Sequence, residues 1–532
     1  MDKIYFVAKQ ESTGIILDFE SFAIDRIIFS FKKNIYLDKI RLLCLTNDKK
    51  WKEILNYNLL ISSNNKIVID FEKTIFNYLK IELSEQTYFQ VEIDLFLRNR
   101  IIVAGLNSYI GDRFLSILNS MYIADILNFN FAMVWNSRKV DTKDMKKYQN
   151  DKKLVSYIID DEKEIFDDLF LQKNSYTSAL PIRQTKWMSK MSFHDLKYGP
   201  FVEKQWGWYV GHSPLEHFIE GEIDKSYSIK LKEYFKKIIF SKKVQEIIAK
   251  IDLLAKNFIK KNGNFHAIHV RTGDLVYCDE NPFFAAVHWR KAMPPEIALE
   301  LALKNLENNM NIVLFGDSLS VVEEIQMHCV NTYYQGKARI YKAQELIDDL
   351  SCPTPFLQAF AEIIFMSNAD EIYSGDSSFA RLASIIGHGK EPKYYFKFFS
   401  FVQQQDILMD NIGILNTDNI MKAYTMCYYY LISRLYLKKN FNHLVKIVFK
   451  ILSYNSNNEF YHVLFIDSLL NLEKYDTAER HLDDFIFKLQ REDRFLSCLK
   501  QSSFYNLFKN VYMSDKINEK YQKLMLIKSS II

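Results

Sequence analysis

Three mostly apolar runs in this 532-residue chain, each typical of a strand, are followed by charged or hydroxyl residues. An arginine in such a place is costly to remove from water unless it meets an anion, and its planar guanidinium suits a phosphate. Serine hydroxyls and backbone amides at the start of a helix favour the same kind of ligand. The runs, with the residues that follow them, are 266–270 with Arg271 and Asp274, 312–315 with Asp317, and 371–373 with Ser377 and Ser378. Together they predict a site for a phosphate-bearing ligand.

Each of these residues also has an ordinary structural explanation. Arg271 and Asp274 are spaced to close a turn as an ion pair. Ser377 or Ser378 is of the type that caps a helix, which is the commoner use of serine at such a position. Both explanations stay open for each residue taken singly, whereas the recurrence at three run ends favours a ligand site.

The loop Gly105–Arg113, which follows the apolar run 101–104, is a second candidate. It matches neither the dinucleotide fingerprint G-x-G-x-x-G nor the Gly-Lys-Ser/Thr ending of a P-loop. Its glycines nevertheless let the backbone approach a ligand closely, and the helix that follows aims its first amides at the same place. We expect Gly105 and Gly111 to face a bound diphosphate from the side opposite Arg271.

Parallel sheets must position these residues. The continuous apolar run 101–104 is typical of a strand buried on both faces. Residues at helical spacing follow over 114–125, and a second strand pattern lies at 131–135. A strand–helix–strand unit has parallel strands, and a second α/β series follows it. We therefore predict an α/β protein with two Rossmann-type domains, at 98–255 and 256–402, whose ligand lies beyond the carboxyl ends of the strands.

The flanking regions have different patterns. Residues 1–97 carry short alternating runs separated by Asn, Asp and Ser, which predict an antiparallel β-sandwich. Their order resembles that of discoidin-type carbohydrate-binding modules, with a β-sandwich that binds nothing as the alternative. Residues 403–532 are helical in pattern, and Phe441 recurs as Tyr475 34 positions later. That period resembles tetratricopeptide repeats and predicts a stacked helical region, which is a candidate surface for a protein partner or an oligomer.

Composition excludes several classes of protein. The net charge of +4 is too small for general nucleic-acid binding in a chain of this length. The amino terminus has no basic region followed by an apolar run, and no apolar stretch is long enough to cross a membrane. Six scattered cysteines show neither metal nor disulfide spacing. We expect a cytoplasmic protein that is able to associate with the inner face of the membrane.

The motif His269–Asp274 resembles the first motif of the fucosyltransferase superfamily, whose usual form is His-x-Arg-Arg-Gly-Asp. The strand end at Asp317 is similar to the second motif of that superfamily, and Ser377–Ala383 is similar to the third. Gly105–Leu118 resembles its amino-terminal glycine loop and helix in a divergent form. The resemblance covers residues 101–390. It implies a GT-B fold, in which two Rossmann-like domains face each other and the second holds most of a GDP-sugar.

The resemblance also implies roles for single residues. In the superfamily the motif arginine binds the β-phosphate of the donor, the motif histidine and a helix carboxylate contact guanine, and a hydroxyl of the third motif touches the β-phosphate. The residues that match these roles here are Arg271, His269, Glu362, and Ser377 or Ser378. Some members carry the general base where this chain has Asp279, with Asp274 and Glu280 as competitors. The superfamily inverts the sugar and needs no metal, so the GDP-sugar is a co-substrate and no cofactor is expected.

Thr272 stands where the superfamily commonly has a second arginine. The lost charge leaves the donor open between GDP-fucose and GDP-heptose. We expect a bacterial glycosyltransferase that acts on an oligosaccharide or polysaccharide acceptor of a capsule or another surface glycan. A carbohydrate-binding scaffold without catalysis, and another α/β enzyme that binds a nucleotide or a phosphate, are the alternatives.

Overall fold

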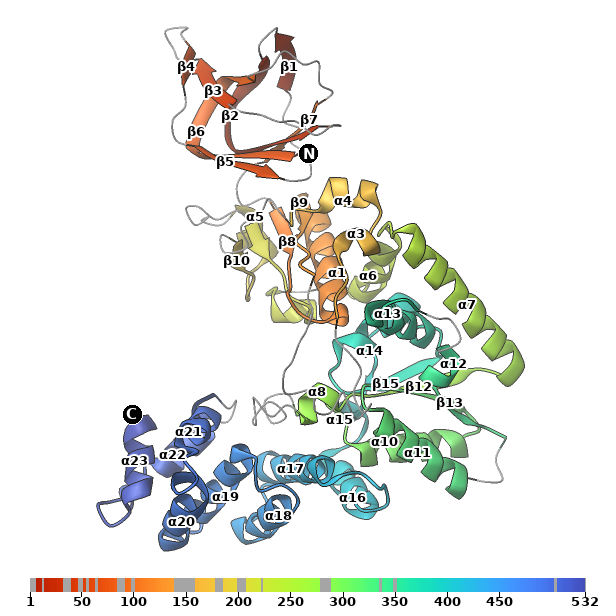
Figure 1. Ribbon diagram of the computed structural model, residues 1–532, viewed down its shortest axis with the longest axis vertical. Coiled ribbons are helices and arrows are strands. Elements are labelled where there is room, and N and C mark those ends of the chain that lie inside the picture. The colour runs from red at the N-terminus through yellow and green to blue at the C-terminus, as the bar shows by residue number, and fades with distance from the viewer. Residues whose placement is uncertain are drawn as a thin grey trace. The chain divides into compact units, whose positions relative to one another are not determined.

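The structure of the chain is a computed structural model, and its elements are labelled in Figure 1. It describes residues 6–11, 14–31, 40–45, 51–53, 57–62, 66–83, 91–96, 101–137, 158–177, 185–198, 207–221, 223–277, 289–333, 337–347, 352–501 and 505–531. The chain divides into two compact units, one made of residues 1–138 and 160–244 and the other of 139–159 and 245–532. Each unit is described by itself below.

Antiparallel strands β1 to β7 form the amino-terminal sheet of the first unit (Figure 1). They are β1 (Phe6–Glu11), β2 (Gly14–Phe31), β3 (Ile40–Leu45), β4 (Trp51–Glu53), β5 (Tyr57–Ser62), β6 (Lys66–Leu83) and β7 (Val91–Phe96). The long strands β2 and β6 pair with each other, with register shifts in β2 between Asp18 and Phe22 and between Ile24 and Arg26. The first part of β2 also pairs with β1 and its last part with β7. The antiparallel pairing agrees with the alternation in the sequence, and the two-layer sandwich stays a prediction.

The first unit also contains a parallel sheet. Its strands are β8 (Ile101–Ala104), β9 (Asn130–Met133), β10 (Thr185–Trp187) and β11 (Gly207–Tyr209), in the order β10-β11-β8-β9. The helical elements are α1 (Ile110–Leu127), α3 (Glu162–Ile165), α4 (Asp168–Asn174), α5 (Phe193–Tyr198), η2 (Leu215–His217) and α6 (Tyr227–Lys236). All four residues of β8 are buried, as its apolar run predicts. The strand, helix and strand predicted between residues 101 and 135 are therefore confirmed.

A second parallel sheet lies in the second unit. Its strands are β12 (Phe265–Val270), β13 (Asn311–Gly316), β14 (Ile340–Lys342), β15 (Glu371–Ser374) and β16 (Lys393–Tyr394), in the order β14-β13-β12-β15-β16. The helices are α7 (Lys242–Asn262), α8 (Gly273–Val276), α10 (Pro295–Glu307), α11 (Leu319–Thr332), α12 (Ala343–Ile347), α13 (Pro355–Met366), α14 (Ser378–His388) and α15 (Tyr395–Phe398). The three predicted strands are present and parallel, which confirms a mixed α/β protein with parallel sheets.

Helices alone make up the carboxyl-terminal part of the second unit (Figure 1). They are α16 (Phe401–Asn411), α17 (Asn419–Leu435), α18 (Phe441–Tyr454), α19 (Glu459–Asn471), α20 (Tyr475–Leu482), the π-helical η4 (Asp483–Phe487), α21 (Glu492–Gln501), α22 (Tyr505–Tyr512) and α23 (Gln522–Ile531). Helices α18 and α20 begin at the two residues that define the period in the sequence. The tetratricopeptide assignment itself stays a prediction.

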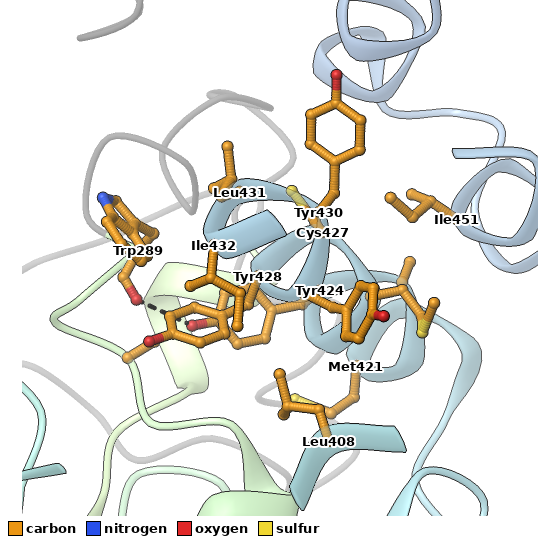
Figure 2. Close-up of a cluster of buried hydrophobic side chains, with 14 of the residues drawn as sticks. Trp289, Leu408, Met421, Tyr424, Cys427, Tyr428, Tyr430, Leu431, Ile432 and Ile451 are labelled. Carbon is orange, nitrogen blue, oxygen red and sulfur yellow. Dashed lines mark hydrogen bonds between the residues drawn. The ribbon is translucent and has the colours of Figure 1, made fainter. Parts of the chain in front are cut away.

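One hydrophobic core joins these helices to the second parallel sheet. It runs from Ile268 in β12 through Tyr424 and Tyr428 in α17 to Ile527 in α23. Figure 2 shows the middle of this core, where side chains of α17 lie beside Trp289. Buried residues before and after residue 402 therefore belong to one cluster, and the boundary placed there stays a prediction.

Candidate functional site

The carboxyl ends of β12, β13 and β15 form one edge of the second sheet, called the carboxyl edge below. The chain adds β13 and β14 on one side of β12 and then β15 and β16 on the other. The order of the strands thus reverses between β12 and β15. In open α/β sheets ligands bind outside the carboxyl ends of the strands at such a reversal. Because His269 pairs with Ser374 at this position, the residues that follow both strands meet at the reversal point.

Arg271 leaves the end of β12 with its side chain about one-eighth exposed. Its Nη2 donates to both carboxylate oxygens of Asp274, at 3.3 and 3.1 Å. The ion pair that the sequence left as an alternative is therefore present. A guanidinium has five N–H donors in a planar fork, so this pair is compatible with an anion bound to the same side chain.

Asp317 holds the turn that follows Arg271. Its Oδ1 accepts hydrogen bonds from the backbone N–H groups of Thr272 and Gly273, at 2.8 and 2.9 Å. Gly316, just before it, permits the close approach of β12 and β13, because a Cβ there would lie 2.9 Å from the carbonyl oxygen of Val270. The structure thus gives Asp317, predicted to bind the donor, a defined part in positioning the arginine.

His269 is buried and lies with its ring stacked on Phe379, at 5.1 Å between ring centroids. Burial first, and the nearby Arg271 charge second, lower the pKa of His269 to about 3. The imidazole is therefore neutral at physiological pH and has one nitrogen donor and one nitrogen acceptor. Its Nδ1 is buried and has no hydrogen-bond partner among the described residues.

Two hydroxyls at the carboxyl edge are also buried without a hydrogen-bond partner among the described residues. Ser377 is the N-cap residue of α14, yet its side chain makes no capping hydrogen bond. The Ser377 and Thr272 hydroxyls are both buried without a partner in the described part of the chain. A buried polar group left without a partner costs about 1–3 kcal/mol. Three such groups around one reversal point are the pattern expected of a site that a polar ligand completes.

A segment of five residues, 289–293, crosses the carboxyl edge and was not foreseen from the sequence. Its Met293 N–H donates to the carbonyl oxygen of Arg271 at 3.1 Å. Its Arg290 carbonyl oxygen accepts from the N–H of Asp376 at 2.8 Å. Gly375 allows this crossing, because a Cβ there would lie 2.4 Å from the carbonyl oxygen of Lys291. The crossing segment therefore links the turn after β12 to the loop after β15.

Two of the remaining predicted residues have a place in the structure and a third does not. Glu362 is about nine-tenths buried on α13, a helix that packs through Phe365 on Phe265 of β12. Ser378, half-buried, is the first residue of α14. Asp279 lies outside the described residues, as does its competitor Glu280. The general base therefore remains a prediction, and of the three acids only Asp274 is placed.

The glycine loop belongs to the first unit and is held by a residue that the sequence did not single out. Arg113 Nε donates to the carbonyl oxygen of Ser108 at 2.6 Å, and its Nη1 donates to that of Asn136 at 2.8 Å. Gly105 follows β8 and Gly111 lies in the first turn of α1, and both are buried. Arg113 thus fixes the loop between them from within.

Comparisons with known proteins give structural neighbours only. No family model matches the chain, and no curated protein does. Among solved structures, the fucosyltransferase NodZ from Bradyrhizobium is 12% identical, with 54% of this chain and 92% of that chain covered and a TM-score of 0.30. POFUT1 in complex with GDP-fucose is 13% identical over 55% of this chain and 95% of that chain, with a TM-score of 0.29.

Arabidopsis thaliana FUT1, solved as a mutant with GDP, is a third neighbour. It is 10% identical over 55% of this chain and 69% of that chain, with a TM-score of 0.30. TM-scores this low carry no argument about function. The function proposed below therefore depends on the geometry of the carboxyl edge.

No group of three or more His, Cys, Asp or Glu side chains in the described part of the chain is arranged to hold a metal ion. No helix there is both long and apolar enough to cross a bilayer.

Proposed function

We propose that the chain is a glycosyltransferase that moves a sugar from a GDP-activated donor to a hydroxyl of a glycan acceptor. The observation that carries the proposal is the carboxyl edge of the second sheet. There Arg271 lies beside three buried polar groups that have no partner among the described residues. The motif resemblance at His269–Asp274 supports GDP as the nucleotide.

The chemistry of transfer explains why an arginine belongs at this place. A new bond forms between the acceptor oxygen and the sugar C1 while the bond from C1 to the β-phosphate oxygen breaks, through an oxocarbenium-like transition state. Negative charge grows on the departing GDP. A guanidinium that is already held by Asp274, on a backbone that the crossing segment holds through the Arg271 carbonyl oxygen, interacts more strongly with that charge than with the ground state, which is what catalysis requires.

The remaining parts of the reaction are assigned by the same proposal. The neutral ring of His269 and the buried carboxyl of Glu362 contact guanine, and Ser377 donates to the β-phosphate. The acceptor proton goes to a carboxylate. Asp274 is engaged by Arg271, which leaves Asp279 and Glu280 as the acids to test first. Transfer proceeds with inversion and without a metal, from GDP-fucose or GDP-heptose to an oligosaccharide or polysaccharide of the cell surface.

Calorimetric titration with GDP, UDP and ADP, with and without EDTA, tests the proposal. We expect GDP to bind best and EDTA to have no effect. Arg271→Ala should weaken GDP binding by about 10- to 100-fold, the loss expected for charge-assisted hydrogen bonds. Arg480→Ala, on α20, is the matched control and should bind as the wild type does.

Because Arg271→Ala leaves the buried Asp274 without its partner, the double variant Arg271→Ala/Asp274→Ala is measured beside it. The double variant should keep the fold, and its GDP affinity should stay below that of the wild type, as in Arg271→Ala. A preference for UDP, or a metal requirement, would overturn the proposal in favour of another nucleotide enzyme. Glycan binding without nucleotide binding or donor hydrolysis would indicate a scaffold instead.

A further inference from the structure

The crossing segment 289–293 is attached to the carboxyl-terminal helices as well as to the carboxyl edge. The guanidinium of Arg290 lies between aromatic rings, with its Cζ 4.8 Å from the ring centroid of Trp289 and 5.5 Å from that of Tyr436. Its Nη2 donates to the Tyr436 hydroxyl at 2.5 Å. Cation–π contacts of this kind contribute about 0.5–2 kcal/mol each. Phe396 of α15 is a third ring, at 5.3 Å, so Arg290 is held from its own segment, from α15 and from the end of α17.

Tyr436 is in turn held by α16. It is the residue at which α17 ends, and its ring stacks on Phe401 at 3.9 Å between centroids and 16° between planes. A ring stacked this closely has little freedom to move, so its hydroxyl presents a fixed acceptor to Arg290. The guanidinium thus connects the first residue of α16 and the end of α17 to the crossing segment.

Two buried tyrosines also hold the same segment, and Figure 2 labels one of them, Tyr424, together with Trp289. The hydroxyl of Tyr395 donates to the carbonyl oxygen of Ala292 at 3.0 Å. The hydroxyl of Tyr424, in α17, donates to the carbonyl oxygen of Trp289 at 3.3 Å. The Ala292 end of the segment is therefore tied to α15, and the Trp289 end to α17, through backbone carbonyl oxygens. A shift of α17 acts on the segment through the Trp289 end.

The other contacts of the segment lead directly to the carboxyl edge. The Arg290 carbonyl oxygen holds the N–H of Asp376, next to Ser377, and Met293 holds the carbonyl oxygen of Arg271. The backbone position of Arg290 thus sets the position of the loop on which Ser377 lies. Misplacing a binding group by about 1 Å is enough to lower activity by a large factor.

We propose that Arg290 and Tyr436 are positioning residues for the nucleotide site, and that α16 and α17 are part of that site rather than a separate module. The proposal rests on the proposed function, because it concerns the same carboxyl edge. It assigns the carboxyl-terminal helices a direct effect on donor affinity, which no feature of the sequence indicates.

Two measurements on the same variants test this proposal. We expect Arg290→Ala and Tyr436→Ala to weaken GDP binding by about tenfold, the effect of roughly one lost hydrogen bond. Both should also speed backbone amide exchange in the peptide that contains residues 374–378, measured without ligand. Arg290→Lys should recover part of the affinity, since it restores a cation between the rings. Tyr436→Phe keeps the stacking on Phe401 but removes the acceptor, so a smaller loss is expected.

Tyr430→Phe is the matched control. Tyr430 is a buried tyrosine of the same helix whose hydroxyl lies 2.9 Å from that of Ser468, inside the helical region. The control should lower the melting temperature at least as much as Tyr436→Phe while leaving GDP affinity and exchange at 374–378 unchanged.

Wild-type exchange and affinity in Arg290→Ala and Tyr436→Ala would overturn the proposal, as would equal effects in Tyr430→Phe. The exchange measurement needs no nucleotide, so it tests the coupling separately from the proposed function. If the wild type binds no GDP but Tyr436→Ala still loosens the 374–378 peptide, the function fails and the coupling stands.

Discussion

At the scale of single residues, buried hydroxyls at the carboxyl edge that have no partner among the described residues lower the stability of the unliganded protein. Ser377 occupies the N-cap position of α14 without capping it, and Thr272 keeps a buried hydroxyl in a turn that Asp317 already fixes. In a protein selected only for stability, an alanine and a valine would serve better at these two positions. Unsatisfied groups that persist at a strand-order reversal are a signature of function.

A first prediction follows for Ser377. Ser377→Ala should raise the unfolding free energy of the unliganded protein by about 1 kcal/mol, because it removes a buried group that has no partner, and should weaken GDP binding severalfold. Denaturant titration and calorimetry measure the two effects. Ser384→Ala, in the same helix, removes a hydroxyl that donates to the Lys390 carbonyl oxygen at 2.8 Å. That control should lose stability and keep its affinity, and a loss of stability in Ser377→Ala would contradict the prediction.

The sequence predicts which residues lie at the carboxyl edge, but it gives only part of the role of each. Arg271 and Asp274 were expected to be either a ligand site or an ion pair, and the structure shows the ion pair at the edge where a ligand belongs. Asp317 accepts from two backbone N–H groups, a role that depends on where the chain folds back. Arg113 holds the glycine loop through carbonyl oxygens. Bonds to the backbone require no particular residue type at the partner, so they leave no pattern in a single sequence.

At the scale of elements, Gly375 allows two segments to cross. Gly375→Ala would place a Cβ 2.4 Å from the carbonyl oxygen of Lys291 and 2.8 Å from that of Arg290. Because both contacts are with backbone, the crossing segment has to move. We predict a loss of about 1–3 kcal/mol of stability, as for an overpacked core, together with a loss of GDP affinity.

Gly387→Ala provides the comparison for this prediction. Its Cβ would meet the carbonyl oxygen of Ser367 at 2.1 Å, at the other end of α14 from the carboxyl edge. Its stability should fall by a similar amount, measured by denaturant titration, while calorimetry finds GDP binding to the folded protein intact. If both variants bind GDP equally well, the crossing does not position the site.

Helix α10 gives a prediction on pH. Burial raises the pKa of Glu296 to about 7 from an ordinary value of 4.5. The folded protein therefore holds this proton more tightly than the unfolded chain. The stability that Glu296 contributes is present below pH 4.5 and is lost as the pH rises through 7. Glu296→Gln keeps an acceptor for Thr425, whose hydroxyl donates to Glu296 at 2.8 Å, and removes the titration.

Melting temperatures between pH 5 and 8 measure this effect. The difference between Glu296→Gln and the wild type should shift in favour of the variant as the pH rises. Glu300→Gln, one turn further along α10 and paired with Lys304, should show no such trend. A difference that is constant over this range would contradict the prediction.

The elements themselves were predicted well where apolar residues dominate a short run. The strands at 101–104, 266–270, 312–315 and 371–373 are found because strands buried on both faces are rich in apolar residues, with His266, His269 and Glu371 as the polar exceptions. The crossing segment was missed, because its conformation is set by tyrosines that lie more than a hundred residues later in the chain. Contacts between residues so far apart in the sequence cannot be predicted from local periodicity.

At the scale of the whole molecule, the second unit has one core. Ile451 in α18 is fully buried in the same hydrophobic cluster as Ile268 in β12. We predict that Ile451→Ala lowers the free energy of unfolding by about 2–5 kcal/mol, as is typical of such a truncation. It should therefore lower the temperature of the same calorimetric transition that GDP raises. A separate transition at lower temperature, insensitive to GDP, would show that the helices unfold on their own.

The contacts of Tyr436 also bear on how the protein matures. During synthesis the strands of the second sheet leave the ribosome before α16 and α17. Until these two helices have been made, the contacts that hold the carboxyl edge are incomplete. The apolar side chains that α16 and α17 later cover stay open to water and to chaperones over that interval. A premature stop codon between Ala383 and Tyr436 would therefore release a polypeptide that has every motif residue of the edge and lacks the contact of Tyr436 with Arg290.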